Sequence, residues 1–142
     1  MQRQLLKSKI HRAVVTEANL HYTGSLTLGR PLAQAADILA HEFVHITNVN
    51  NGRHWVTYVI IDCDHDHTVC LNGSAARHFI PGDPIIIMAY GYYGQDELDL
   101  ARPRLVYVNQ NNEITQIVTS EPLFESWESP PSPGPGIGTV AK

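Results

Sequence analysis

Two histidines and a glutamate in the first half of the sequence match the spacing of a zinc site. His41 and His45 flank Glu42 in the run H-E-F-V-H, where two histidines one helical turn apart would bind zinc beside a general-base glutamate. Residues 46–52 favour a strand and a turn over a helix, and no third ligand follows at a familiar spacing. We therefore interpret the run as a helix end that leads into a strand, with a zinc hydrolase as the alternative.

A second group of possible ligands spans residues 62–70, which read D-C-D-H-D-H-T-V-C. Mixed carboxylate and thiolate ligands select no single metal, and a tip between two strands rarely holds four ligands in place. We interpret this segment as a solvated hairpin tip and expect no metal. Cys63 and Cys70 make no disulfide framework, which fits a reducing compartment.

A third candidate is the dipeptide Gly24-Ser25, within L-H-Y-T-G-S-L. A Gly-Ser pair is an ordinary turn in most proteins. It becomes reactive when the fold strains the peptide so that the Ser25 hydroxyl attacks the Gly24 carbonyl, since glycine adopts conformations that other residues resist.

Short strands separated by turns must position these groups. Residues 50–52, Asn-Asn-Gly, tolerate positive φ and predict a hairpin between strands at 43–49 and 54–63. A short amphipathic helix is expected at 32–40, after Pro31. Many short strands favour a compact β-barrel, so we predict a mainly β fold with short helices. Further strands are expected at residues 4–16, 68–71, 85–90 and 104–109.

Length and composition indicate one domain. The chain has 142 residues and a formal net charge of −4, with no basic run to attract nucleic acid or anionic lipid. Five of the nine prolines lie in the last 21 positions, so we predict a folded domain at 1–120 and a Pro/Gly-rich flexible tail at 121–142. No apolar run approaches a membrane span or a signal peptide, and we expect a cytoplasmic protein.

Several blocks of the sequence, in order, resemble the pyruvoyl-dependent aspartate 1-decarboxylases. The resemblance covers about three quarters of the chain, and the succession H-Y-x-G-S, N-G-x-x-x-x-T-Y and N-G-x-A-A carries most of its specificity. The matching blocks are K-S-K-I-H-R at 7–12, A-N-L-H-Y-T-G-S at 18–25, A-A-D-I-L at 35–39, N-G-R-H-W-V-T-Y at 51–58, L-N-G-S-A-A at 71–76, P-G-D-P-I-I-I-M-A-Y at 81–90 and R-P-R-L-V-Y-V at 102–108.

This resemblance implies a double-psi β-barrel that assembles as a homotetramer with active sites at subunit boundaries. It implies self-cleavage between Gly24 and Ser25 into fragments 1–24 and 25–142, through an ester of the serine hydroxyl, followed by β-elimination. Ser25 would thereby become a pyruvoyl group, an electron sink for the loss of carbon dioxide from an amino acid. The implied reaction converts L-aspartate to β-alanine and carbon dioxide for pantothenate biosynthesis.

Family roles carry over to matching positions. The resemblance makes Tyr58 the proton donor and Thr57 a substrate contact that also assists cleavage, although both types are common in strands for packing reasons. Lys9 would line the carboxylate side. His11 and Tyr22 would support the site, and His78 is expected at the surface. The implied substrate loop comprises Asn72, Gly73, Ser74 and Ala75.

One position departs from the family pattern. His54 stands where an arginine normally grips the substrate's side-chain carboxylate in two parallel hydrogen bonds, and the nearby Arg53 is one residue early, which points it to the opposite face of a strand. A histidine binds a carboxylate more weakly and in a pH-dependent way. Ser74 and Thr47 also differ from the usual residues. We therefore keep open a paralogue that acts on a different or modified amino acid.

Two further questions stay open. The chain could be an unprocessed member of the family that binds amino acids or a partner without catalysis. Cleavage could also be spontaneous or need a maturation factor.

Overall fold

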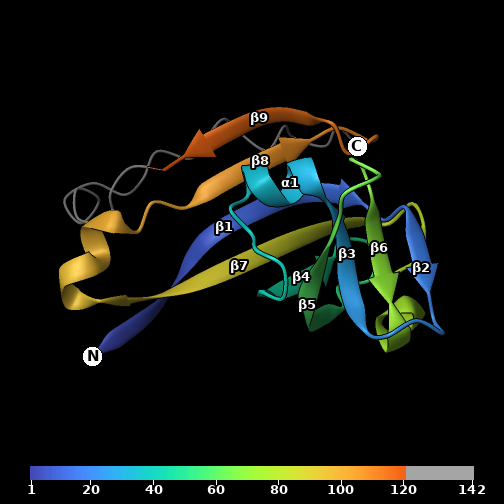
Figure 1. Cartoon of the computed structure of the whole chain (residues 1–142), viewed down its shortest axis with the longest axis horizontal. Coiled ribbons are helices and arrows are strands. Elements are labelled where there is room, and N and C mark those ends of the chain that lie inside the picture. The colour runs from blue at the N-terminus through green and yellow to red at the C-terminus, as the bar shows by residue number, and fades with distance from the viewer. Residues whose placement is uncertain (121–142) are drawn as a thin grey trace, which may run out of the picture.

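The computed structural model describes residues 1–120, so the predicted tail at 121–142 lies outside the described residues. The described part is mainly β, with a nine-stranded sheet and three short helices (Figure 1). The strands are β1 (Gln2–Val14), β2 (Glu17–Asn19), β3 (Ser25–Gly29), β4 (Phe43–Asn48), β5 (His54–Asp62), β6 (Val69–Asn72), β7 (Pro84–Gly94), β8 (Arg104–Val108) and β9 (Ile114–Thr119). The helices are α1 (Arg30–Ala35) and the 3-10 helices η1 (Gly73–Arg77) and η2 (Gln95–Leu100).

The two ends of the first seven strands in the sheet order, β2 and β1, are consecutive in the chain. The strands lie in the order β2-β6-β3-β5-β4-β7-β1-β8-β9, and β2 follows β1 in the chain after only Val15 and Thr16. The N–H of Val15 donates to the Asp83 carbonyl just before β7 (2.9 Å), and that of Thr16 donates to the Val69 carbonyl in β6 (2.8 Å). One continuous segment therefore joins both ends of the first seven strands into a barrel-like sheet. The predicted mainly β fold is confirmed, and its double-psi connectivity stays a prediction.

Side-chain alternation gives this sheet a buried inner face and a distinct outer face. Ile10 pairs with Ile87, which pairs with Ile46, and all three side chains are fully buried. Because successive side chains point to opposite faces, the neighbouring row of Lys9, Met88 and His45 faces outward.

The predicted hairpin is confirmed. β4 pairs antiparallel with β5 from Phe43 opposite Tyr58 to Thr47 opposite His54, and Gly52 takes the positive φ of 70° in the connecting turn. β1 and β7 form a long antiparallel pair that extends away from the other strands toward the N-terminus (Figure 1). The predicted strands at 4–16, 68–71, 85–90 and 104–109 correspond to β1, β6, β7 and β8, with shifted ends.

The predicted helix at 32–40 is too long. α1 ends at Ala35, and Asp37 has a left-handed φ of 52°, which ends the helix. The N–H of Ile38 bonds instead to the Ala33 carbonyl (2.9 Å). This turn buries Ile38 while it leaves Leu39 70% exposed, so the apolar spacing that suggested five more helical residues does not follow one helix face.

The predicted hairpin tip between residues 62 and 70 is also wrong. β5 and β6 do not pair with each other, because β3 lies between them, parallel to β5 and antiparallel to β6. The connecting loop instead crosses the end of β3 so closely that a Cβ on Gly29 would lie 2.1 Å from the Asp66 carbonyl oxygen. Sequence reasoning had not identified β2, β3 or β9 as strands. Within residues 1–120 no helix is both long and apolar enough to cross a membrane.

Candidate active site around Ser25

Ser25 and Asn72 face each other at the ends of two paired strands. Ser25 begins β3, Asn72 ends β6, and the antiparallel register places them directly opposite. The Asn72 side-chain Nδ2 donates to Ser25 Oγ at 2.9 Å, and Ser25 Oγ donates to the Thr23 carbonyl at 3.2 Å. Ser25 is only 1% exposed. The structure therefore brings together two predicted site residues that are 47 positions apart in the sequence.

Gly24 and Gly73 differ in how far their backbones require glycine. Gly24 has no positive φ, and a Cβ there would meet only the Asn72 carbonyl at 4.0 Å. Its role in cleavage stays a prediction. Gly73 does require glycine. Its φ is +71°, and a Cβ would lie 2.7 Å from Gly24 Cα. Gly73 thus lets the start of η1 press against the peptide predicted to cleave.

Tyr58 lies on the same face of the sheet as Ser25. Leu26 pairs in parallel with Val59, and both are fully buried on the inner face, so the residues before them, Ser25 and Tyr58, both face outward. The ring of His41 stacks on the Tyr58 ring, with 6.1 Å between centroids.

Thr57 has the opposite orientation. It pairs with the fully buried Val44, faces inward and is 9% exposed. The two adjacent residues predicted to serve one site therefore point to opposite sides of β5.

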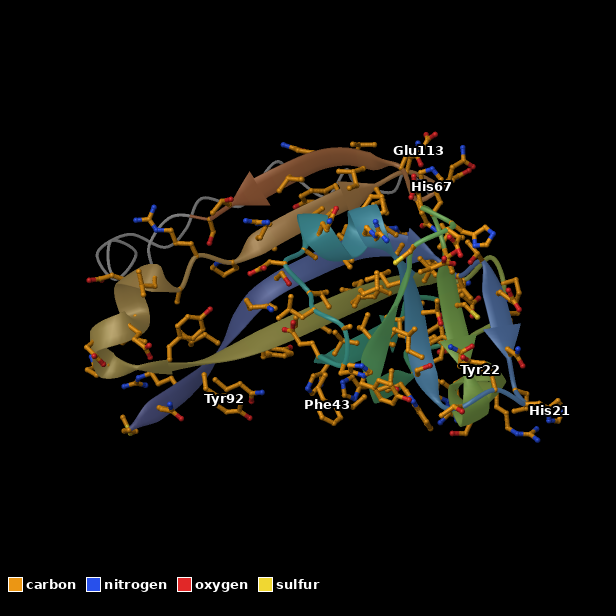
Figure 2. All side chains as sticks on the ribbon, viewed as in Figure 1. His21, Tyr22, Phe43, His67, Tyr92 and Glu113 are labelled. Carbon is orange, nitrogen blue, oxygen red and sulfur yellow. The ribbon has the colours of Figure 1, made fainter. Side chains whose placement is uncertain are left out.

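A cavity of about 400 Å³ opens beside this junction on the outer face of β3 and β6. Tyr22 is 53% exposed at its wall, and Figure 2 shows it over the lower part of β6, with His21 farther out. Burial, and then the charge of Glu17, raise the pKa of Cys70 to about 11, against a smaller lowering by the Asn19 backbone N–H. The cavity is lined by Glu17, Asn19, Tyr22, Thr27, Asp62, His65, Thr68, Cys70 and Asn72.

His54 lies in a different part of the outer face. His54 Nε2 is 3.1 Å from His45 Nδ1, and the His45 ring meets the Tyr90 ring edge-on at 4.9 Å. Lys9 lies in the same outward row as His45. His54 is four residues before Tyr58 on β5, about 13 Å along the strand. His54 is thus distant from Ser25, and Lys9 lies on β1, three strands from β5 in the sheet.

The other predicted residues have mixed positions. His11 is half-buried against Tyr107, its Nδ1 has no partner among residues 1–120, and burial, followed by the charges of Lys9 and Arg12, lowers its pKa. His78 is partly exposed, and its ring lies against Trp55 with 5.5 Å between centroids. In the loop after Asn72, Ser74 is exposed and Ala75 is buried.

The two motifs that resemble metal sites, at residues 41–45 and 62–70, have structural roles instead. His41 lies in a turn with φ of 68° and His45 lies in β4, so they are not one helical turn apart. Asp62 caps the loop after β5: the N–H groups of Asp64 and His65 and the hydroxyl of Thr68 donate to its carboxylate. The Asp64 N–H is the largest cause of its lowered pKa. Among residues 1–120 no three His, Cys, Asp or Glu side chains gather as a metal site.

Sequence reasoning missed three residues that contact the predicted site. Thr27 and Cys70 both hydrogen-bond to the Asn72 side chain, and His45 contacts His54. Side chains two positions apart on a strand share a face, so Thr27 lies on the face of Ser25 and Cys70 on the face of Asn72. This rule could have identified both residues only once β3 and β6 were known to be neighbours.

Comparison with known proteins gives one consistent result. The sequence model of the family described as aspartate decarboxylase matches residues 1–115. Three curated relatives are named aspartate 1-decarboxylase. The protein from Helicobacter hepaticus is 50% identical over 117 residues, 82% of this chain and 97% of the relative. That from Caldicellulosiruptor saccharolyticus is 48% identical over 118 residues, 83% of this chain and 92% of the relative. That from Clostridium kluyveri is 44% identical over 121 residues, 85% of this chain and 95% of the relative.

Proposed function

The chain belongs to the aspartate decarboxylase family, and we propose that it removes the α-carboxyl group of L-aspartate to give β-alanine and carbon dioxide, as for pantothenate biosynthesis. The match over residues 1–115 is the observation that carries this proposal, because it spans nearly all of the described chain. The described contacts around Ser25 give it a physical basis.

We propose that the cofactor is a pyruvoyl group made from Ser25 by self-cleavage after Gly24, with no metal. The residues present fit this chemistry. The Ser25 hydroxyl is buried and held by Asn72, while Gly73 packs against Gly24, so the reactive hydroxyl and its peptide are fixed relative to each other. Once formed, the group supplies a ketone that accepts the electrons released with carbon dioxide.

The chain's own residues then bind the substrate and move a proton. Tyr58 shares the outer face with Ser25, which supports its proposed role as donor of the proton that replaces the lost carboxylate. Asn72 contacts Ser25, and Gly73 packs against Gly24, which supports a substrate-binding role for the segment that begins with them. Thr57 faces the barrel interior. This orientation is more compatible with a role in cleavage, through the neighbouring backbone, than with direct contact to the substrate.

The separation of Ser25 from His54 supports a shared site. His54 and Tyr58 are separated by about 13 Å along β5. A single aspartate molecule is too short to span this distance. Since Lys9 and His54 face outward, a neighbouring copy could place its own pair against Ser25. We therefore propose the homotetramer of the family, with Lys9 and His54 completing the site across a boundary.

His54 favours a second candidate function. A neutral or shared-proton histidine pair gives a carboxylate fewer charged donors than a guanidinium fork does. The enzyme could therefore act on an amino acid with a different or modified side chain, with the same cleavage and proton donor.

Intact mass and product analysis test these proposals together. Self-cleavage predicts one fragment of residues 1–24 and another that begins at the modified Ser25, and borohydride with an amine should label the second. A processed protein should release carbon dioxide from L-aspartate and form β-alanine. A chain that stays intact and unreactive, with a maturation factor from its own host present, would instead support a non-catalytic binding protein.

A further inference from the structure

The Asn72 side chain is held by three hydrogen bonds from one face of the sheet. Its Nδ2 donates to Ser25 Oγ and to Thr27 Oγ1, both at 2.9 Å, and Cys70 Sγ donates to its Oδ1 at 3.3 Å. Asn72 is 3% exposed and Cys70 is 6% exposed, so water competes little for these groups. All the polar atoms of this buried amide therefore have protein partners.

An asparagine amide can be turned by 180° with little change in shape, so its neighbours must select the orientation. Cys70 Sγ lies 3.3 Å from Asn72 Oδ1, and a protonated thiol donates to an oxygen acceptor. A thiol with a pKa of about 11 keeps its proton at neutral pH. Cys70 consequently favours the orientation in which Asn72 Oδ1 faces the thiol.

Thr27 acts from the other side of the amide. With Oδ1 turned toward Cys70, the two hydrogens of Nδ2 have two acceptors, Thr27 Oγ1 and Ser25 Oγ. The Ser25 hydroxyl then directs its own proton to the Thr23 carbonyl. In the turned orientation Oδ1 would face Ser25 and draw the hydroxyl proton toward Asn72, which would change the rotamer from which Oγ must attack.

We propose that Cys70 and Thr27 are positioning residues for self-cleavage, which hold the Asn72 amide group toward Ser25 and so set the rate of the reaction. This inference rests on the proposed cleavage at Gly24–Ser25. In the first step Ser25 Oγ forms a bond to the Gly24 carbonyl carbon, the Gly24–Ser25 C–N bond breaks, and the hydroxyl proton ends on the released amine of Ser25, which gives an ester of unchanged mass. β-Elimination then breaks the Ser25 Cβ–Oγ bond, releases residues 1–24 with a Gly24 carboxylate, and leaves a dehydroalanine that water hydrolyses to the pyruvoyl group and ammonia. Water is the one further reactant, and no oxidant is needed.

The rate of cleavage after cell-free synthesis of the full chain tests the inference. Intact mass at successive times follows the loss of uncleaved protein. Cys70→Ala and Thr27→Val should each slow cleavage about fivefold, the rate equivalent of one neutral hydrogen bond. Cys70→Ser replaces the thiol with a hydroxyl that can also donate, Thr27→Ser keeps the hydroxyl, and both variants should retain most of the rate. Cys63→Ala, at the exposed cysteine, is the matched control and should cleave as the wild type does.

Melting temperatures in a Ser25→Ala background separate positioning from general stability. Positioning predicts that Cys70→Ala and Cys70→Ser melt alike there while their cleavage rates differ in the background that keeps Ser25. Wild-type rates in both Cys70→Ala and Thr27→Val would overturn the inference, and so would a Cys70→Ser variant as slow as Cys70→Ala. A wild-type chain that never cleaves, even after addition of an extract from its own host that contains any maturation factor, would contradict the proposed function itself.

Discussion

His45 Nδ1 and His54 Nε2 lie 3.1 Å apart on the outer face of the β4–β5 hairpin. One of the two rings must supply the proton in this contact, and the choice of tautomer decides whether the free His54 nitrogen offers a donor or an acceptor. An arginine offers donors only. The residue at the position predicted to bind the substrate's side-chain carboxylate is thus coupled to a neighbour that an arginine would not need.

His54→Arg should raise kcat/KM for L-aspartate by about tenfold, because a guanidinium fork gives the side-chain carboxylate two charge-assisted hydrogen bonds. Carbon dioxide release from a panel of amino acids measures the change. Arg53→Ala is the control and should leave kcat/KM unaltered. Full wild-type activity on L-aspartate, with no rival substrate in the panel, would contradict an altered specificity.

Ser25→Ala should abolish both cleavage and decarboxylation, because the methyl side chain has no nucleophile for the Gly24 carbonyl. Intact mass would show only the full-length chain. Ser120→Ala removes a hydroxyl far along the sequence and should leave cleavage unchanged. Cleavage that persisted in the Ser25→Ala chain would place the reactive peptide elsewhere.

Gly73→Ala should both destabilise the fold and slow cleavage. The left-handed φ alone costs about 1–2 kcal/mol for a residue with a Cβ, and that Cβ would also lie 2.7 Å from Gly24 Cα. Gly52→Ala isolates the first effect, because Gly52 has a φ of +70° with nothing within 4 Å of the added Cβ. Chemical denaturation should show a larger loss for Gly73→Ala, and only that variant should cleave slowly.

Asp83 should make the protein less stable in acid. Burial alone would raise its pKa, but hydrogen bonds from the Ile80 N–H and the side chains of Asn48 and Asn50 outweigh burial and lower it. Stability from this group is therefore fully present above a pH of about 4 and falls as the pH drops through the lowered pKa.

Asp83→Asn tests this acid dependence. It should cost about 2 kcal/mol at neutral pH, because an amide cannot accept all three donors. Urea unfolding at neutral and acid pH should show this loss shrinking as the pH falls. Asp99→Asn, at an exposed position, should match the wild type at each pH.

The two cysteines should differ in reactivity toward iodoacetamide at pH 8. Cys63 is exposed, whereas Cys70 is buried with a pKa of about 11, so little of its thiolate forms. Mass spectrometry of the folded protein should find one adduct, at Cys63. The urea-unfolded protein should take two, and rapid alkylation of Cys70 in the folded state would contradict its assigned protonation.

The sequence predicted those parts of the fold that depend on local signals. Asn51 and Gly52 marked the hairpin because a turn dipeptide acts within a few residues. β3 escaped notice because four of its five side chains are buried, which leaves no alternation to read. The helix prediction extended to residue 40 because Leu39 continued an apolar spacing, although its side chain is exposed.

The candidate site was predictable mainly through resemblance. Ser25, Tyr58 and Asn72 were identified in this way, and the structure places them on one face. The contacts of Cys70 and His45 depend on which strands are neighbours and in what register, and these properties are set by long-range packing. The close approach at Gly73, rather than at Gly24, likewise depends on how η1 meets the start of β3.

The pairing of Ser25 with Asn72 also determines when, during synthesis of the chain, the serine hydroxyl can be held in place. A ribosome completes the Gly24–Ser25 bond long before it adds residues 72 and 73, and the strand that carries Asn72 must dock before the serine hydroxyl is held. In the proposed cleavage, the bond that breaks is thus among the first made, and we expect it to stay intact until more than half of the polypeptide has been synthesised. Proposed maturation would therefore report that folding has succeeded.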